Sequence, residues 1–490
     1  MTFSFRICHY RKMYSEGLSY DDVLLLPGYS EILPKDCNVQ TVLCEGIKLN
    51  VPVISAAMDT VTEEKLAIAI ALEGGAGVIH RNLKPEEQAR QVANVKRYLN
   101  WIIESPVTVP HDAFVKDVRI LIDTFGISGL PVVDKEGKLK GIITNRDLRF
   151  CKDDSLPVID VMTHQVVYVT GEPTVDNARE KFNKHKIEKL PVVDAKGRLS
   201  GLITVTDMEK NQSFPNAAVD KSGRLIVGAA ISPQDFTVRL PLLKKAKVDF
   251  VVIDTAHGDS KNVMEAVRQI KKDYKIPVIG GNVATTEGTK RLIEAGADAV
   301  KVGIGPGSIC TTRVVAGIGV PQFTAVMDCA EEAAKSNIPV IADGGIKFSG
   351  DITKAIGAGA NVVMIGNLFA GLKESPGSEI IYDGRIYKSY RGMGSMGAIS
   401  AGAGDRYQIT KDEEPVPEGI EGRVPYKGEL RAYMNQLISG LRKGMGYCGC
   451  RSIIELNNYR KFVKITASGL RESHPHDVQI THEAPNYSRI

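Results

Sequence analysis

One cysteine of the chain stands in a setting that favours covalent chemistry. Cys310 lies in the segment GIGPGSICTTR (residues 303–313), where Gly, Pro and Ser precede it and two Thr and Arg313 follow it. A lone cysteine is usually a small buried hydrophobic residue. A glycine-rich loop exposes a thiol, however, and neighbouring N–H groups and positive charge favour the nucleophilic thiolate. We therefore predict that Cys310 is a nucleophile.

A second reactive side chain stands just upstream. Lys301 could form a Schiff base with a carbonyl substrate, as in aldolases. We expect its side chain to point into a helical layer rather than into a site, and therefore discount the aldolase hypothesis.

Polar residues and glycines stand where several apolar segments end. Asp254, Asn282 and Asp343 each follow a run rich in Val and Ile, and glycines follow Asp343 and precede Asn367. Backbone N–H groups that converge in such loops and at helix N-termini bind phosphate. The sequence therefore predicts a phosphorylated substrate.

The apolar segments predict the fold. Eight of them alternate with stretches of helical periodicity, such as KNVMEAVRQIKKDY. They are residues 52–58, 75–80, 224–231, 248–256, 276–283, 297–304, 338–346 and 360–367. Such strands predict a parallel sheet buried on both faces, and their number predicts an α/β (β/α)8 TIM barrel with its site at the strand ends. The alternative is an open, doubly wound sheet, against which no G-x-G-x-x-G follows the first strand.

An internal repeat interrupts the barrel after its second strand-helix unit. GLPVVDKEGKLKGIITNRDL (129–148) matches KLPVVDAKGRLSGLITVTDM (189–208) at an offset of 60 residues. Each copy predicts a βαββα module, and the pair resembles tandem cystathionine-β-synthase (CBS) domains. The resemblance implies an insert over 102–213, divided into 102–160 and 161–213, between barrel segments 1–101 and 214–490.

The resemblance to CBS domains also implies a ligand. In that family the Asp of a T-x-x-D turn contacts the ribose of ATP or another purine nucleotide. Asp147 and Asp207 occupy those places here. The alternative is that both only cap helices.

Composition excludes several classes of protein. In 490 residues, 62 Lys and Arg balance 58 Asp and Glu, which argues against a specific nucleic-acid binder. No apolar run approaches the roughly 18 residues of a membrane span. Eight scattered Cys suit a reducing cytoplasm rather than a disulfide framework. Residues 1–12 do not resemble a signal peptide, and we expect translation to start at Met13.

Several motifs together closely resemble the inosine 5′-monophosphate (IMP) dehydrogenase family. They are GIGPGSICTTR, ADGGI, YRGMGSMGA, GDRYQ and EGIEGRVPYKG, and the resemblance runs from about Gly17 to the C-terminal ESHPHDVQITHEAPNY. It implies oxidation of IMP by NAD and water to xanthosine 5′-monophosphate (XMP), the committed step of guanine nucleotide synthesis.

The resemblance implies roles for residues that match the family motifs. Cys310 would add to the purine, and Arg406 and Tyr407, on a mobile flap, would help water hydrolyse the resulting thioimidate. Thr312 and Glu418 form an alternative proton route. The substrate would contact Ser308, Asp343, Gly344, Gly345, Gly366, Asn367, Tyr390, Gly392, Met393, Gly394 and Glu418. NAD would contact Asp254, Asn282, Gly303, Ile304 and Gly305.

A potassium site and an assembly are implied in the same way. Carbonyl groups of Gly305, Gly307 and Cys310 would bind the ion, completed by Glu472, Ser473 and His474 of a neighbouring subunit. A shared ion implies a homotetramer, and whether pairs of tetramers form an octamer stays open.

Two other functions remain open. GMP reductases share the Cys loop, but they normally lack the CBS pair and do not need Arg406 and Tyr407, which serve hydrolysis. A nucleotide sensor without catalysis is the other alternative, and it would not require Cys310.

Overall fold

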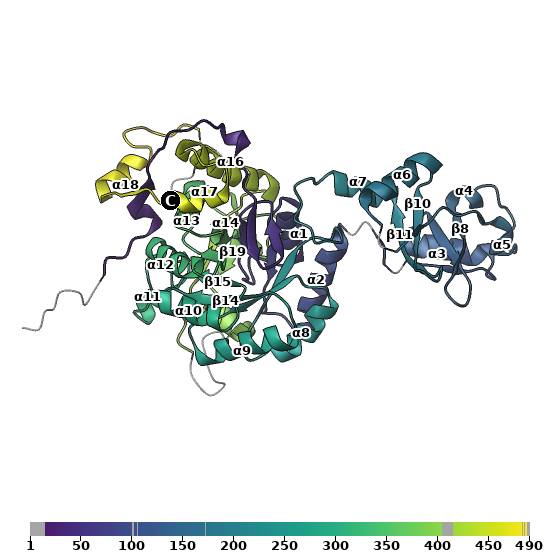
Figure 1. Cartoon of the computed structure of the whole chain (residues 1–490), viewed down its shortest axis with the longest axis horizontal. Helices are drawn as coiled ribbons and strands as arrows, with labels where there is room; N and C mark the ends of the chain where they lie inside the picture. Colours follow the sequence, from purple (N-terminus) through teal and green to yellow (C-terminus); the bar gives the residue numbers. More distant parts are fainter. Residues whose placement is uncertain are drawn as a thin grey trace, which may run out of the picture. The chain divides into compact units, whose positions relative to one another are not determined.

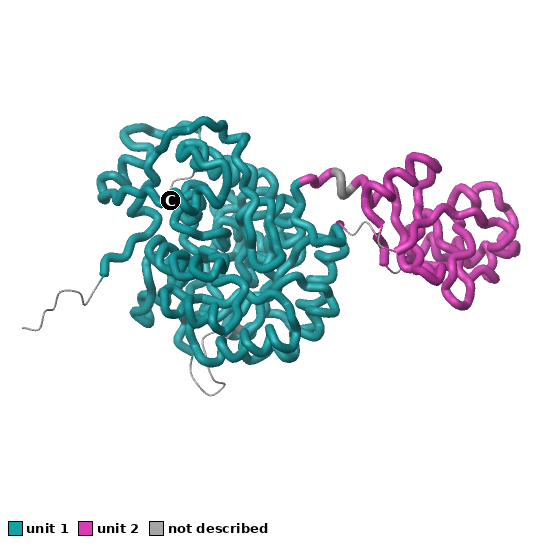
Figure 2. Tube along the Cα trace, in the orientation of Figure 1, with its two compact units in different colours: residues 1–98, 216–490 teal, residues 99–215 magenta. Residues whose placement is uncertain are grey.

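The chain forms two compact units, one of residues 1–98 with 216–490 and one of residues 99–215 (Figure 2). The computed structural model describes residues 15–99, 102–104, 106–171, 173–403, 415–482, 484, 486 and 487. The predicted start at Met13 and the predicted flap residues Arg406 and Tyr407 lie outside the described residues.

The larger unit contains an eight-stranded parallel sheet (Figure 1). Its strands are β4 (Val53–Ser55), β5 (Gly77–Ile79), β12 (Val227–Ile231), β13 (Phe250–Asp254), β14 (Val278–Val283), β15 (Ala299–Val302), β16 (Val340–Asp343) and β17 (Val362–Ile365). They pair in the order β4-β17-β16-β15-β14-β13-β12-β5, and a parallel bridge from Ile54 to Ala76 joins the two outer strands. The predicted barrel is therefore confirmed, and the doubly wound alternative is wrong.

Helices connect the strands and cover the sheet. They are α1 (Glu64–Leu72), α2 (Pro85–Tyr98), α8 (Phe236–Lys245), α9 (Lys261–Asp273), α10 (Thr286–Glu294), α11 (Thr312–Val315), α12 (Gln322–Ala334), α13 (Ser349–Gly357), α14 (Asn367–Ala370) and α16 (Leu430–Cys448). Inside the barrel, one set of side chains from the strands forms a single buried cluster that includes Phe250, Val252, Ala299 and Ile341. The hairpin of β2 (Thr41–Cys44) and β3 (Ile47–Leu49) adds Leu43 and Leu49 to it.

In chain order, a small antiparallel sheet follows the last barrel strand and precedes α16. It consists of β18 (Glu379–Tyr382), β19 (Arg385–Arg391) and β20 (Glu421–Pro425). Between β19 and β20 lie α15 (Met396–Ala398) and η3 (Ile399–Ala403). The end of β19 leads into Gly392, and Glu418 lies just before β20, so this sheet presents two predicted site segments together.

Short elements complete the larger unit. They are η1 (Tyr20–Asp22), η2 (Pro34–Asp36), α17 (Ile453–Tyr459), α18 (Ala467–Ser473) and a two-stranded sheet of β1 (Val23–Leu25) with β21 (Phe462–Lys464). Thus the first and last of the described strands pair with each other.

The smaller unit contains two similar modules. The first has β6 (Val109–Pro110), α3 (Val115–Phe125), β7 (Gly129–Val133), β8 (Leu139–Thr144), α4 (Asn145–Leu148) and, after it, α5 (Val158–Val161). The second has β9 (Val169–Thr170), α6 (Val175–His185), β10 (Lys189–Val193), β11 (Leu199–Thr204) and α7 (Val205–Gln212). The two hairpins pair reciprocally: Leu139 N donates to Gly197 O at 3.2 Å, and Leu199 N donates to Gly137 O at 2.9 Å.

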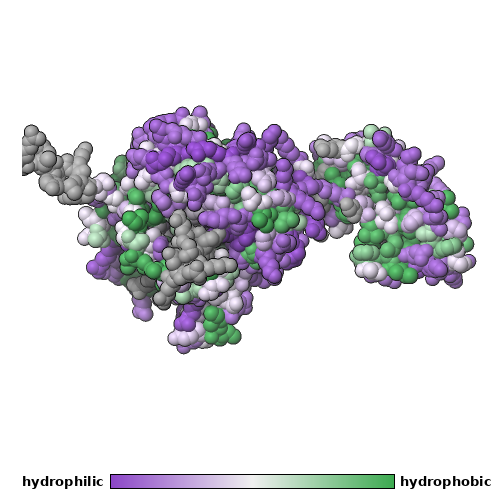
Figure 3. Space-filling model, turned by 90° about the horizontal axis from the view of Figure 1, so that it is seen from below, coloured by the Kyte–Doolittle hydropathy of each residue, from purple (hydrophilic) through white to green (hydrophobic). Residues whose placement is uncertain are grey.

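Hydrophilic and hydrophobic residues are interspersed on the surface, as Figure 3 shows for one face. In the part of the chain that the structure describes, no helix combines the length and apolar character of a membrane span. The seven described cysteines are all free thiols, and five of them are buried.

Candidate active site

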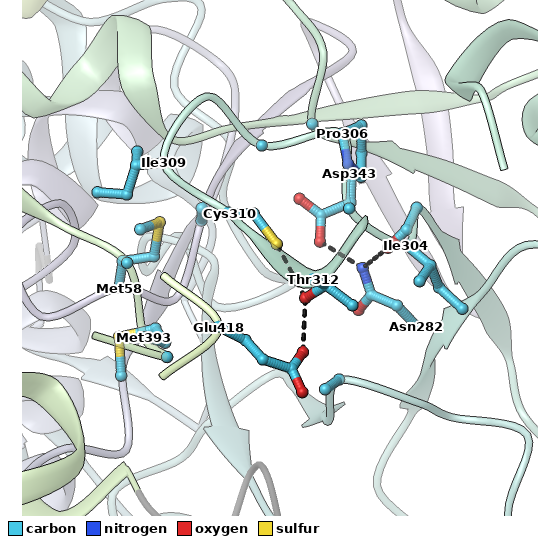
Figure 4. A pocket seen from close by; sticks show the side chains of 18 of the residues that line it. Met58, Asn282, Ile304, Pro306, Ile309, Cys310, Thr312, Asp343, Met393 and Glu418 are labelled. Carbon is cyan, nitrogen blue, oxygen red and sulfur yellow. Dashed lines mark hydrogen bonds between the residues drawn. The ribbon is translucent and has the colours of Figure 1, made fainter. Parts of the chain in front are cut away.

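A cleft opens where the barrel strands end, and most predicted site residues line it. One cavity is lined by Asp254, Asn282, Gly303, Ile304, Gly305, Gly307, Cys310, Thr312, Asp343, Gly344, Tyr390, Gly392, Met393, Gly394 and Glu418 (Figure 4). A second cavity is lined by Ser308, Gly345, Gly366 and Asn367. Both cavities share Gly307, Asp343, Gly344 and Tyr390, so they adjoin along one wall.

The predicted nucleophile is the first member of a short chain of polar side chains. Cys310 Sγ lies 3.1 Å from Thr312 Oγ1, and Thr312 Oγ1 donates to Glu418 Oε2 at 2.7 Å (Figure 4). A chain of two polar contacts therefore connects the Cys310 thiol, through the Thr312 hydroxyl, to the Glu418 carboxylate. Such a line can carry a proton between the thiol and the carboxylate.

Backbone bonds bring Glu418 to the cysteine loop. Thr311 N donates to Glu418 O at 2.9 Å, and Ile420 N donates to Ile309 O at 3.0 Å. Glu418 N donates in turn to Gly394 O at 3.0 Å. The segment before β20 thus pairs with the loop that carries Cys310 on one side and with the turn after β19 on the other.

The Arg313 side chain donates hydrogen bonds to the backbone on both sides of Cys310. Its Nε donates to Ile304 O at 3.2 Å, and its Nη2 donates to Val320 O at 2.5 Å. Burial lowers the pKa of the guanidinium, and interaction with Cys310 opposes that shift. The guanidinium predicted beside the thiol is therefore close to Cys310, and it also binds the backbone at Ile304, before the cysteine, and at Val320, after α11.

The direction predicted for Lys301 is wrong. Lys301 stands two residues after Ala299 on β15, and Ala299 belongs to the cluster inside the barrel. Successive side chains of a strand alternate, so Lys301 also points inward. Its Nζ donates to Asp254 Oδ1 at 2.9 Å and to Asp343 Oδ2 at 2.8 Å, and its side chain is 1% exposed. Lys301 therefore lies beneath the site, paired with two predicted ligand-binding carboxylates.

Comparison with known proteins assigns this arrangement to a family. The model of the IMP dehydrogenase / GMP reductase domain matches residues 17–476. The chain belongs to this family. It is 57% identical to the inosine-5′-monophosphate dehydrogenase of Halalkalibacterium halodurans, over 97% of this chain and 99% of that protein. It is 58% identical to the enzyme of the same name from Aquifex aeolicus, over 97% of this chain and 98% of that protein.

A solved structure of the same family is also similar. It is a GMP reductase variant from Trypanosoma brucei in complex with guanosine 5′-monophosphate, with a TM-score of 0.84 and 39% identity. The match covers 95% of this chain and 99% of that chain, which is too much to omit the insert. This GMP reductase is therefore an exception to the expectation that such enzymes normally lack the insert.

The second cavity is lined by glycines in conformations that other residues avoid and by a buried phenol. Gly344 and Gly345 have φ values of +95° and +83°, which glycine adopts without strain. A Cβ on Gly344 would lie 2.8 Å from Pro306 Cγ, so no larger residue fits. Tyr390 is buried, and burial raises its pKa, with a hydrogen bond from Ser308 opposing the shift. The Tyr390 phenol is therefore a neutral donor on the wall of this cavity.

The predicted potassium ligands fall in two places. Gly305, Gly307 and Cys310 lie together in the cysteine loop, where Cys310 N donates to Gly307 O at 3.1 Å. Glu472, Ser473 and His474 lie at the end of α18, and His474 Nδ1 is 3.1 Å from the Tyr487 hydroxyl. The described residues contain no cluster of His, Cys, Asp or Glu side chains suited to a metal ion.

Sequence reasoning missed several residues of the cleft. Ala56 and Met58 line both cavities, and Tyr20 and Gln322 line the second. Ala56 and Met58 directly follow the first barrel strand, and this position could have identified them. Tyr20 precedes the barrel and Gln322 begins α12, so no local signal distinguishes either one.

Proposed function

We propose that this protein oxidises IMP to XMP, with NAD as hydride acceptor and water as the source of oxygen. The observation that carries the proposal is the line from Cys310 through Thr312 to Glu418 on the wall of a two-part cleft. The high identity to proteins named IMP dehydrogenase, over nearly their full lengths, supports it.

Cys310 makes and later breaks the covalent bond. Its sulfur adds to C2 of the purine, and C2 then releases its hydrogen as a hydride, which leaves a thioimidate. NAD, when bound, supplies the acceptor for that hydride. Without the bond to sulfur, C2 has no route to release a hydride.

The second step is hydrolysis of the thioimidate. Water attacks C2, the C2–S bond breaks, XMP leaves and the thiol is restored. A base must take a proton from the attacking water. Glu418 is connected to the reacting sulfur through Thr312, which supports a role for this pair. Arg406 and Tyr407, which lie outside the described residues, remain the pair predicted first for hydrolysis, and Thr312 with Glu418 remains the alternative route.

Binding roles follow from the two cavities. Asp343 lies on their shared wall, where a carboxylate accepts hydrogen bonds from a ribose diol. The proposed phosphate-binding residues are Ser308, Gly344, Gly345, Gly366, Asn367 and Tyr390. The proposed purine-binding residues are Gly392, Met393, Gly394 and Glu418. NAD falls to Asp254, Asn282, Gly303, Ile304 and Gly305, and the buried acid and amide among them suit its hydroxyl groups.

We propose that a potassium ion binds at the cysteine loop. Its oxygen donors are backbone carbonyls of Gly305, Gly307 and Cys310, and hard cations prefer oxygen ligands. Glu472 and Ser473 are exposed at the end of α18, where a neighbouring subunit can reach them. This arrangement favours a homotetramer, and the octamer and the cytoplasmic location stay predictions.

The smaller unit is proposed to be a CBS pair that binds ATP or another purine nucleotide. In this structure each of the two Asp residues accepts a hydrogen bond from the Thr that precedes its own helix. Thr144 Oγ1 donates to Asp147 Oδ2 at 2.7 Å, and Thr204 Oγ1 donates to Asp207 Oδ2 at 2.6 Å. Asp147 Oδ1 also accepts a long hydrogen bond from Thr163 Oγ1 at 3.5 Å. A carboxylate oxygen has more than one acceptor site, so both Asp residues keep acceptor capacity for a ribose.

One assay tests the activity. The purified protein, given IMP, NAD and potassium, should produce NADH that is followed by absorbance. Because the family also contains GMP reductases, the same protein is given GMP and NADPH. If the protein converts GMP and does not convert IMP, the proposed activity is wrong and the protein is a GMP reductase.

A further inference from the structure

A buried lysine lies between two carboxylates that the proposed function assigns to different ligands. Lys301 Nζ contacts Asp254 Oδ1 at 2.9 Å and Asp343 Oδ2 at 2.8 Å. Asp343 is assigned to the ribose of IMP, whereas Asp254 is assigned to NAD. A single ammonium group therefore joins the two ligand sites.

Asn282 closes the network. Its Oδ1 accepts a hydrogen bond from Lys301, and its Nδ2 donates to Asp343 Oδ2 at 2.9 Å and to Gly303 O at 2.7 Å. Asn282 and Gly303 are both assigned to NAD. Each polar side chain of the cluster is thus hydrogen-bonded to at least one other.

The geometry leaves one oxygen of Asp343 for a ligand. Lys301 and Asn282 both contact Oδ2, and Figure 4 shows the other oxygen turned toward the Cys310 side of the cleft. The two donors therefore fix the rotation of the carboxylate. The ammonium also lies between two carboxylates, and ion pairs interact more strongly when they are partly removed from water.

We propose that Lys301 is a positioning residue that couples the binding of IMP to the binding of NAD, which rests on the proposed function. When a ribose diol bonds to the second oxygen of Asp343, it reduces the motion that the carboxylate and Lys301 still have, and through Lys301 it also reduces the motion of Asp254. The second ligand then finds its side chains already ordered, so less conformational freedom is lost on its binding. By linkage, each ligand strengthens the binding of the other by the same factor.

Binding without turnover measures this coupling. In a Cys310→Ala background, IMP is titrated by calorimetry with and without saturating NAD. We expect NAD to tighten IMP binding by about fivefold or more. Adding Lys301→Met should reduce that factor to less than about twofold.

The chain contains a matched control. Lys96 Nζ contacts Asp220 Oδ2 at 2.9 Å and Asp249 Oδ2 at 2.8 Å, and its side chain is 4% exposed. Asp249 precedes β13, so this triad lies at the opposite end of the strand that carries Asp254. Lys96→Met in the Cys310→Ala background should destabilise the barrel and leave the coupling factor unchanged. An equal loss of coupling in both variants would overturn the proposal, because any buried triad would then have the same effect.

A second variant covers the case in which Lys301→Met does not fold. Asp254→Asn keeps the lysine, and Asp254 is not assigned to IMP. In the Cys310→Ala background without NAD, it should still weaken IMP binding by at least about threefold, because Asp343 is then the one carboxylate of the cluster that forms an ion pair with Lys301. Unchanged IMP affinity would overturn the proposal.

The possible failures are distinguishable. If Cys310→Ala protein binds neither IMP nor NAD, the proposed function fails. If it binds both, but independently of each other, the dehydrogenase stands and only the coupling is refuted.

Discussion

Replacing Thr312 by Val tests whether the Cys310–Thr312–Glu418 line takes part in catalysis. Valine has nearly the same shape but lacks the hydroxyl that donates to Glu418 Oε2 at 2.7 Å and lies 3.1 Å from Cys310 Sγ. A hydrogen bond to a charged group contributes about 1.5–3 kcal/mol. If that bond is needed in the transition state of hydrolysis, turnover should fall about 10- to 150-fold.

Rapid mixing with IMP and NAD separates the two chemical steps. Thr312→Val should still give a burst of NADH equal to the number of sites, followed by the slowed steady phase, because only hydrolysis is impaired. Thr311→Val is the matched control, since the Thr311 side chain makes no capping hydrogen bond at the start of α11. Adding Glu418→Gln to Thr312→Val should cost little more than the slower single variant, because both act in one line. Turnover of Thr312→Val within twofold of Thr311→Val would refute the reasoning.

Four further outcomes are expected. Cys310→Ala should abolish NADH formation while retaining IMP binding in calorimetry, and substantial turnover would remove Cys310 as the nucleophile. Asp343→Ala should weaken IMP binding by ~2 kcal/mol or more, because hydrogen bonds to a carboxylate are lost; unchanged affinity would remove it from the ribose site. Deleting residues 102–213 with a short linker should leave a folded, active barrel that no longer responds to purine nucleotides, whereas a folded but inactive product would place the insert in the site. Arg406→Ala should keep the NADH burst and slow the steady phase, and loss of the burst would assign Arg406 to hydride transfer.

The barrel could be predicted from the sequence because its strands are short apolar segments, and the segments between them have helical periodicity. Each of the eight predicted segments contains one strand of the closed sheet, from Val53–Ser55 to Val362–Ile365. The repeat was readable because its two copies are similar at a constant offset. Cys310 was identified because glycines and Arg313 surround it within a few residues.

Contacts between distant segments were not readable from residue patterns. Thr312 and Glu418 are 106 residues apart, and only the pairing of β20's leading segment with the cysteine loop brings them together. The resemblance to a family named both residues, but it gave no distance between them. Tyr20 and Gln322 reach the cleft from elements that no strand-end rule covers.

The direction of the Lys301 side chain shows most clearly what could not be predicted from the sequence and was decided only by the tertiary structure. The sequence by itself determined that a lysine stands on a barrel strand, two residues after Ala299. A strand exposed on one face alternates polar and apolar residues, but a strand buried on both faces is apolar throughout and does not show which side faces the barrel axis. Only the closed sheet placed Ala299 inside, and with it Lys301 beside Asp254 and Asp343. Because a buried ammonium needs partners, the carboxylates that strands β13 and β16 bring to the same end of the barrel decide its role.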